Sequence, residues 1–440
     1  MALISRRGVL SLALAGGRGL RVSTFAADVT PPLGAPLCYG LVPVAGSVVD
    51  RLEARGVVLY PAGERPIVLC AVDWLGIGNE SRDRWRAALA KAAGTVPGRV
   101  ALHTVHQHDA PGDDVSAYGL LAKGVPMYDE AFARGTVARV AAAVKRARPV
   151  AVTQVTGGAA AVEGVASNRR ILGAEGKVVF GRMTACRNSA QCGAPEGVID
   201  PLLRSVSFWA GEKRVATLSY YATHPMSYYG KGGVSCDFVG LARNEQRDTF
   251  QVHFTGAAGN IGAGKYNDGA PANRAVLQER MARAMAAARA AEKALPMDGV
   301  RWVSEPVAMP LREGKGFGEA EIVAAIGDAG LDSKQRANHA RYLAFLRLTK
   351  AGRKIDLTAL RLGGFHVVHM PGELFVEYQL AAAKERAGEM VATAAYGDYG
   401  PMYIGTARAY DEGGYETSAV SRVSPAVEDV LLTAVRRLLG

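Results

Sequence analysis

Apolar positions in the first hundred residues repeat first as in strands, then as in a helix, then as in a strand again. Residues 56–60 and 66–72 are short apolar runs that predict strands, and the second run, apolar on both faces, predicts a central strand. Residues 81–94 have a helical pattern, with Ser81 as the expected N-terminal cap. Residues 99–106 alternate between two faces, as a strand does. This order predicts an α/β architecture.

Similar patterns continue to the C-terminus. A first strand within residues 20–34 ends at Pro31-Pro32, because proline cannot continue a central ladder. Further strands are predicted at residues 151–156, 177–181, 203–209, 213–221, 250–254, 356–362 and 365–370. Helices are predicted at residues 128–147, 272–294, 318–328, 333–350, 374–387 and 425–438. We therefore predict an α/β fold in which mixed β-sheets are flanked by helices.

The composition is ordinary for a soluble globular protein, with 49% hydrophobic and 21% charged residues among 440. The net charge is +11, from 52 basic and 41 acidic residues, and the basic residues are scattered rather than gathered in a tail. No recognisable nucleic-acid module accompanies this charge, so we expect no nucleic-acid partner. No stretch reaches the roughly 18 uninterrupted apolar residues of a membrane-spanning helix. The sequence does not indicate an oligomeric state.

The N-terminus is similar to a twin-arginine export signal. Ser5-Arg6-Arg7-Gly8 is followed by a short apolar run, and Ala13-Leu14-Ala15 would be the cleavage site. We therefore expect residues 1–19 to be an export signal and the protein to be periplasmic or secreted. The alternative is an N-terminal strand preceded by a disordered tag.

Five cysteines are present, without a C-x-x-C motif, so the sequence predicts no structural zinc finger. Cys186 and Cys192 enclose a polar loop and can form a local disulfide in an oxidising compartment. Cys70 lies within an apolar run, and we expect it to be a buried small hydrophobic side chain.

Histidines stand at the ends of two predicted strands. His106 and His108 follow the strand at 99–106, and His224 follows the strand at 213–221. Histidines delivered into a loop in this way are typical of metal ligands or a general base, although a solvated strand end would also explain them. Glu373 precedes the helix at 374–387, where the helix dipole alone would favour an acidic residue.

A glycine-rich loop follows the strand at 250–254. Gly259-x4-Gly264-Lys265 has the outline of a phosphate-binding loop. However, Tyr266 stands where a serine or threonine would hold magnesium, and no helix begins at once. We therefore predict that these glycines let the backbone pass close to a neighbour or a ligand instead.

Several short motifs, taken in order, resemble the catalytic domain of the neutral/alkaline non-lysosomal ceramidases. That family hydrolyses the amide bond of N-acyl-sphingosines with a zinc ion. The resemblance covers most of residues 20–420. The motifs are ADVTPPLG at 27–34, HQHDAP at 106–111, NRR at 168–170, ATHP at 222–225, SCDFVG at 235–240, GAAGN at 256–260, PGE at 371–373, YIGT at 403–406 and YE at 415–416. The order of the motifs, rather than any single one, makes the resemblance specific.

The resemblance implies a site. Its zinc ligands would be His106, His224, Glu373 and Tyr403. The residues lining the reaction centre would be His108 for proton transfer or substrate hydrogen bonding, Arg169 for substrate anchoring and Tyr415 for contact with the carbonyl or oxyanion. Asp237 would hold the surrounding shell or the loop, and His369 is the reserve ligand.

The chain also departs from the family's pattern. Gln107 and Asp109 replace the family's threonine and serine around the histidine pair. We expect residues 20–440 to form a ceramidase-like zinc hydrolase catalytic domain without the family's C-terminal immunoglobulin-like domain. That departure puts lipid presentation and ceramide specificity in doubt.

Three hypotheses follow. The first is a zinc-dependent amidohydrolase acting on a ceramide-like N-acyl lipid or a related small-molecule amide, with peripheral membrane contact left open. The second keeps the metal-activated water but cleaves an ester or lactone. The third is a non-catalytic envelope- or carbohydrate-binding protein on a ceramidase scaffold. Metal content separates the third hypothesis from the first two.

Overall fold

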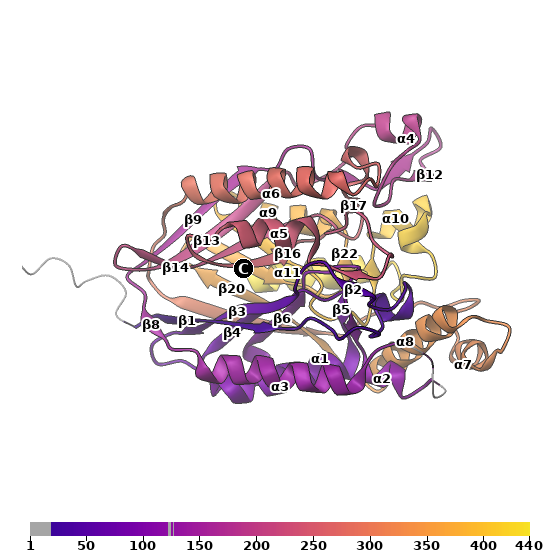
Figure 1. Cartoon of the computed structure of the whole chain (residues 1–440), viewed down its shortest axis with the longest axis horizontal. Coiled ribbons are helices and arrows are strands. Elements are labelled where there is room, and N and C mark those ends of the chain that lie inside the picture. Colours follow the sequence, from indigo (N-terminus) through magenta and orange to yellow (C-terminus); the bar gives the residue numbers. More distant parts are fainter. Residues whose placement is uncertain (1–18, 122–124, 126) are drawn as a thin grey trace, which may run out of the picture.

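The computed structural model describes residues 19–121, 125 and 127–440 of the chain. The predicted export signal therefore lies outside the described residues, apart from Gly19. Three larger β-sheets form the centre of the described part, and helices cover their outer faces (Figure 1). The predicted mixed α/β architecture is confirmed.

The first sheet contains the strands predicted in the first hundred residues. In spatial order it consists of β6 (Val100–Thr104), β4 (Ile67–Val72), β3 (Glu53–Tyr60), β1 (Arg21–Asp28) and β8 (Val150–Ala151). Every residue of β4 is buried, which confirms that this strand is central. The helices α1 (Asn79–Ala93) and α3 (Glu130–Arg146) pack on this sheet.

Two details of this first region differ from the prediction. Helix α1 begins two residues before Ser81, whose hydroxyl donates to the Asp113 carboxylate at 2.6 Å instead of capping the helix. Strand β6 ends at Thr104, because His106 adopts a left-handed backbone with φ 75° and turns the chain. Both features depend on neighbours that are distant in the sequence or on local backbone strain, which periodicity does not encode.

The second sheet is covered by α6 (Ala272–Ala290) and α5 (Asp237–Glu245). Its strands, in spatial order, are β16 (Phe250–Thr255), β14 (Lys213–Tyr221), β13 (Leu202–Ala210), β9 (Gln154–Ala161) and β18 (Lys293–Ala294). The strands predicted at 203–209 and 213–221 are present as β13 and β14, which form an antiparallel hairpin around Gly211. The predicted helix at 272–294 is shorter than expected, because its last residues form β18 at the sheet edge.

The third sheet lies against α9 (Val376–Glu385) and α11 (Val427–Leu439). Its strands, in spatial order, are β19 (Val300–Val307), β20 (Ile355–Leu362), β21 (Phe365–His369) and β23 (Met390–Ala394). Strand β16 of the second sheet contacts strands of both other sheets, so the three sheets share one hydrophobic core.

Each of the three sheets has one parallel pair among its described strands: β4 with β6, β14 with β16, and β21 with β23. The helices α1, α5 and α9 make the three crossovers, so each pair is a β-α-β unit. In open α/β sheets, ligands bind beyond the carboxyl ends of parallel strands. The loops that follow these three pairs are therefore the expected place for a site.

Shorter elements complete the chain. The two-stranded sheets are β2 (Ser47–Val48) with β15 (Gly233–Val234), β5 (Gly76–Ile77) with β7 (Gly112–Asp113), β10 (Ser167–Asn168) with β17 (Ile261–Gly262), β11 (Arg170–Leu172) with β12 (Val178–Gly181), and β22 (Glu373–Leu374) with β24 (Tyr403–Ile404). The remaining helices are α2 (Val115–Tyr118), α4 (Ser189–Gly193), α7 (Glu319–Gly327), α8 (Ser333–Lys350) and α10 (Ala407–Glu412). Most of these elements gather at one end of the molecule (Figure 1).

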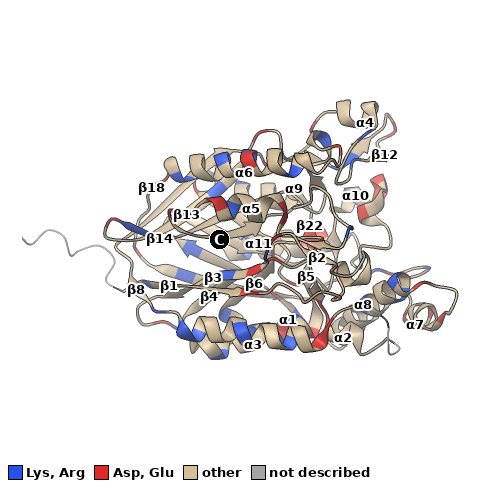
Figure 2. Ribbon diagram, viewed as in Figure 1, with Lys and Arg blue, Asp and Glu red and all other residues tan. Residues whose placement is uncertain are grey.

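The expected disulfide between Cys186 and Cys192 is present beside α4, and Cys70 is buried as expected. Lysine and arginine positions are spread over α1, α3, α5 and α6 and over the sheets (Figure 2). No helix in the described part of the chain combines the length and the apolar character that a membrane span requires.

Candidate metal and catalytic centre

Three buried side chains converge from the three β-α-β units. His106 follows β6, His224 follows β14, and Glu373 follows β21. Their exposed fractions are 0%, 1% and 2%. The Glu373 carboxylate oxygen Oε2 lies 3.1 Å from His224 Nε2 and 3.3 Å from His106 Nε2. The loops after the parallel pairs therefore meet in one polar centre within the core.

Backbone carbonyls determine which nitrogen of each imidazole carries the proton. His106 Nδ1 lies 2.7 Å from the Leu75 carbonyl oxygen, and His224 Nδ1 lies 2.7 Å from that of Ala258. A carbonyl oxygen can only accept a hydrogen bond, so each Nδ1 must donate. Leu75 follows β4 and Ala258 follows β16. In both of these units the imidazole follows one strand of the parallel pair, and the carbonyl that orients it follows the other strand.

The inward-facing atoms of this centre are electron-pair donors. Burial and the Arg169 guanidinium lower the pKa of His224 to about 4, which leaves its Nε2 unprotonated at neutral pH. Burial raises the pKa of Glu373, but the two facing imidazoles outweigh it and hold the pKa well below its ordinary value. His106 Nε2 is buried without a hydrogen-bond donor among the described residues. Atoms that can each offer a lone pair thus converge on one buried space, an arrangement that could hold a metal ion.

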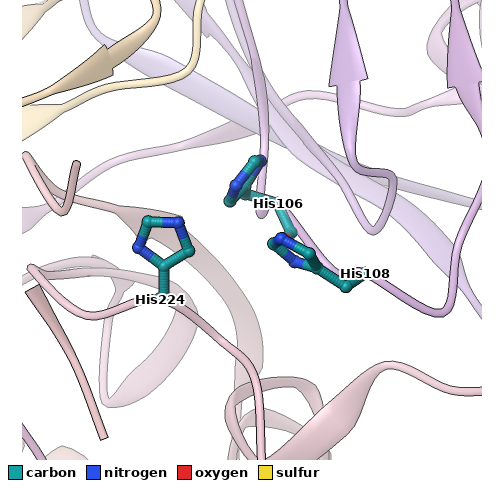
Figure 3. A group of neighbouring side chains, drawn as sticks. All are labelled: His106, His108 and His224. Carbon is teal, nitrogen blue, oxygen red and sulfur yellow. The ribbon is translucent and has the colours of Figure 1, made fainter. Parts of the chain in front are cut away.

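His108 lies beside this pair. One ring nitrogen of each of His106, His108 and His224 lies within 4.8 Å of the other two, and the rings face a common space (Figure 3). His108 Nδ1 lies 3.1 Å from the His106 carbonyl oxygen. Burial and the two neighbouring imidazoles hold the pKa of His108 well below its ordinary value. His108 is therefore neutral at pH 7 and can accept a proton, and it is less buried than the other two.

The remaining predicted residues also lie in this cluster. Arg169 Nη1 lies 3.3 Å from both His224 Nε2 and the Tyr403 hydroxyl oxygen. Its Nε lies 3.4 Å from a Glu416 carboxylate oxygen, and all of these side chains are buried. The Tyr415 ring stands edge-on to the Tyr403 ring at 5.6 Å and is 48% exposed. The structure thus brings together all seven predicted site residues; their individual roles stay predictions.

The pairing of β22 with β24 explains how Glu373 and Tyr403 meet. These two residues are directly opposite each other in a parallel ladder, so their side chains project on the same side. The Glu373 carboxylate faces the imidazoles and not the amino end of α9, so the helix dipole does not account for it. Burial raises the pKa of Tyr403 well above its ordinary value, and the nearby Arg169 opposes this only in part.

Three further contacts were not predicted. The Tyr399 hydroxyl donates to Glu373 Oε1 at 2.6 Å, and the Tyr396 ring stacks on the His106 ring at 4.3 Å. The Tyr229 ring stands edge-on to the His108 ring at 5.1 Å. The density of tyrosines after residue 395 was the available signal for the first two. No local pattern marks Tyr229, which reaches the centre through the loop after His224.

Two residues considered for the site lie outside its ligand positions. His369 packs against His103 and Trp302 between the sheets, with its Nδ1 3.1 Å from the Thr358 hydroxyl oxygen. Asp237 accepts from the Ser227 amide at 3.0 Å and from the Ser227 hydroxyl at 2.6 Å. Asp237 therefore holds the loop that follows His224, and His369 belongs to the core.

The glycine-rich loop supports the centre. A Cβ atom on Gly259 would lie 2.2 Å from the carbonyl oxygen of Glu373, so only glycine lets these two backbones approach. The Lys265 amino group donates to the carbonyl oxygens of Cys192 and Ala194 at 3.1 and 2.6 Å. This arrangement agrees with the expected close approach of the backbone to a neighbour, and the lysine is engaged by backbone carbonyls.

The burial of His369 predicts an acid-sensitive stability. Burial lowers its pKa from 6.5 to about 3. Between these two pH values the His369 side chain is protonated in the unfolded chain and neutral in the folded chain. As far as His369 determines it, the free energy of unfolding is therefore greatest above pH 6.5 and falls as the pH drops toward 3. Urea unfolding of His369→Leu should show a pH slope smaller than wild type by about 1.4 kcal/mol per pH unit between pH 6 and 4.

A non-titrating control is available in the same strand. Val367→Ala, also buried in β21, should lower the free energy of unfolding at every pH without changing the slope. Equal slopes for wild type and His369→Leu would show that His369 is not neutral in the folded state.

The fold and the centre together define a class of protein: an α/β domain that holds a histidine and carboxylate centre where three β-α-β units meet. Among solved structures, the fold matches the neutral ceramidase from Pseudomonas aeruginosa with a TM-score of 0.68 and 16% identity, over 96% of this chain and 74% of that one. It also matches a ceramidase complexed with C2, with a TM-score of 0.67 and 16% identity, over 96% and 75%. No protein-family model and no curated protein matches the sequence. The fold implied by the sequence motifs, that of the neutral ceramidases, is confirmed.

Proposed function

We propose that this protein is a zinc-dependent amidohydrolase that cleaves the amide bond of a ceramide-like N-acyl substrate. The observation that carries the proposal is the meeting of His106 Nε2, His224 Nε2 and Glu373 Oε2, three atoms that can each offer an electron pair to a cation, in a buried centre. The fold of the neutral ceramidases and the order of the sequence motifs support the same activity. The chemistry of the centre and the similarity of the fold to the neutral ceramidases therefore favour the same function.

The donor set suits zinc. His106, His224, Glu373 and Tyr403 would hold the ion, because zinc binds imidazole nitrogen and carboxylate or phenol oxygen. Each imidazole is already oriented by a carbonyl on its other nitrogen, and Tyr399 orients Glu373 in the same way. When bound, zinc lowers the pKa of a water and polarises the scissile carbonyl.

The other residues of the centre supply proton transfer and substrate contacts. His108 is neutral and lies on the exposed side of the centre, so its imidazole can take a proton from the attacking water and return it to the leaving amine. The Tyr415 hydroxyl at the rim would donate to the carbonyl oxygen as it gains charge. Arg169, held by Glu416 and Tyr403, would anchor a polar group of the substrate.

Exposed apolar side chains at the same end of the molecule support a lipid substrate and peripheral membrane contact. One group lies on the loops joined by β2 and β15, and a second lies on the β11–β12 hairpin (Figure 1). The exposed members are Leu41, Val44, Val48 and Val49 in the first group and Leu172, Val179 and Phe180 in the second. Apolar surface of this kind is typical of contact with a membrane or an apolar ligand.

The disulfide supports the proposed location. We propose that the protein is periplasmic or secreted, as the twin-arginine motif at Arg6-Arg7 suggests. The bond between Cys186 and Cys192 is of the kind that persists in oxidising compartments, whereas the three remaining cysteines are buried. Export can be measured by fractionating cells that express the full chain and a variant with Arg6 and Arg7 replaced by lysine.

Paired substrates test the reaction. The purified protein should contain about one zinc per chain and should hydrolyse an N-acyl-sphingosine that carries a fluorescent acyl chain, with activity lost on chelation and restored by zinc. The control is the matched O-acyl ester of the same acyl chain. Cleavage of the ester without cleavage of the amide would reassign the enzyme to esters or lactones. A protein without zinc that cleaves neither substrate would contradict the enzyme proposal and leave a binding function.

A further inference from the structure

We propose that Tyr229 is a positioning residue for His108, and that Asp109 holds the loop that presents it. The inference rests on the proposed function, because it assigns Tyr229 a part in the proton transfer by His108. Tyr229 lies in none of the sequence motifs, and Asp109 stands where the family that the motifs resemble has a serine. The proposal follows from a pair of reciprocal contacts between the His108-Asp109 and Tyr229-Gly230 segments.

The first contact joins the two rings. The His108 ring lies 4.7 Å from the His106 ring, 5.8 Å from the His224 ring and 5.1 Å from the Tyr229 ring, edge-on at 65°. Two of these neighbours are proposed zinc ligands. Among the described residues, Tyr229 is therefore the aromatic neighbour of His108 that is not itself a proposed zinc ligand.

The second contact joins the backbone of one segment to a side chain of the other. The Gly230 amide donates to Asp109 Oδ1 at 2.9 Å, and the Ser235 amide donates to the Asp109 carbonyl oxygen at 3.2 Å. Gly230 has φ 82°, a backbone conformation that glycine adopts readily. Asp109, the residue after His108, thus holds Gly230, the residue after Tyr229. Asp109 also accepts a hydrogen bond from Ser235, at the far end of the same loop.

The loop is held from a second direction. The Gly232 carbonyl oxygen accepts from the Gly46 and Ser47 amides at 2.8 and 3.2 Å, next to the β2–β15 pair. Tyr229 is 39% exposed, so burial alone does not fix its ring. Its position comes from the hydrogen bonds of its loop, and its exposed face reaches the side from which a substrate would approach.

These contacts matter because hydrogen bonding alone does little to orient His108. Its described hydrogen bond runs from Nδ1 to the carbonyl of His106, only two residues away, which leaves the ring free to tilt. A general base acts when its nitrogen is held within hydrogen-bond reach of the proton it takes. The Tyr229 ring narrows the orientations of the imidazole, and its loss should lower kcat while leaving substrate binding largely intact.

Variants at Tyr229 test the proposal with the fluorescent N-acyl-sphingosine as substrate. Tyr229→Ala should lower kcat by about tenfold or more, with KM changed by less than about threefold and zinc content unchanged. Tyr229→Phe keeps the ring and should stay within about twofold of wild type. Val276→Ala, an equally exposed apolar residue on α6, is the matched control and should behave as wild type.

Variants at Asp109 give a second, independent measurement. Asp109→Asn keeps an acceptor oxygen for Gly230 and should be nearly neutral, whereas Asp109→Ala should reproduce the kcat loss of Tyr229→Ala. Because both act on one ring, the double variant should be no slower than the slower single variant by more than about twofold. An additive loss would show that Asp109 acts by another route.

The outcomes separate this inference from the proposed function. Wild-type kcat in Tyr229→Ala would overturn the positioning role, while the loss of activity in His108→Ala would still uphold the hydrolase. A Tyr229→Phe variant as slow as Tyr229→Ala would also overturn it, because the hydroxyl rather than the ring would then matter. Full activity in His108→Ala would instead refute the proposed proton transfer itself.

Discussion

Replacing His106 or His224 by alanine should remove the bound zinc, from about one ion per chain to less than about a tenth, and abolish hydrolysis. Each substitution deletes one Nε2 lone pair from a centre in which Glu373 faces both imidazoles. The backbone bonds at both positions remain, from the His106 amide to the Trp74 carbonyl and from the His224 amide to the Ile261 carbonyl. The folded state should therefore persist, as measured by circular dichroism alongside elemental mass spectrometry.

His369→Ala is the matched control for this experiment. His369 is also a buried histidine at a strand end, but it contacts His103 and Trp302 instead of the centre. This variant should keep its zinc and most of its activity. A His106→Ala protein with a full complement of zinc, or with wild-type turnover, would contradict the proposed metal centre.

His108→Ala should keep the zinc and lower kcat by about 10²–10⁴-fold, the usual contribution of a general acid or base. The pKa of His108 is held well below its ordinary value by burial and by His106 and His224, so the ring is neutral and able to accept a proton. It is also the least buried of the three imidazoles, which places it on the substrate side. Steady-state kinetics and zinc content on the same preparation measure both parts of the prediction.

The zinc content of this variant also distinguishes two ligand sets. Ring nitrogens of His106, His108 and His224 lie within 4.8 Å of one another, so three imidazoles could share an ion. Loss of zinc in His108→Ala would make His108 a ligand. Tyr403→Phe would then be expected to keep its zinc, whereas the ligand set proposed here predicts weaker binding in that variant.

The long helices and many of the strands could be predicted because their burial pattern is local. The continuous apolar run at Ile67–Val72 predicts a strand buried on both faces, and β4 is one. The segment at Val178–Gly181 was predicted as a strand, but it belongs to a small exposed hairpin outside the large sheets. Periodicity describes which face of a segment is apolar and not which partner covers it.

The site could be predicted in part, because side chains carry sequence information and backbone groups do not. His106, His224 and Glu373 stand in recognisable motifs at strand ends. The carbonyls of Leu75 and Ala258, which set the imidazole tautomers, belong to residues with no chemical mark in the sequence. Their role appears only when the parallel strands lie side by side.

The sequence by itself therefore determined the α/β composition of the chain, the positions of most elements and the set of chemical groups available to the centre. The tertiary structure decided how those groups meet. The ladder between β22 and β24 brings Glu373 beside Tyr403, and the loop after His224 brings Tyr229 to His108. Such contacts depend on the packing of three sheets around one core, where burial and hydrogen bonding are settled between residues far apart in the chain.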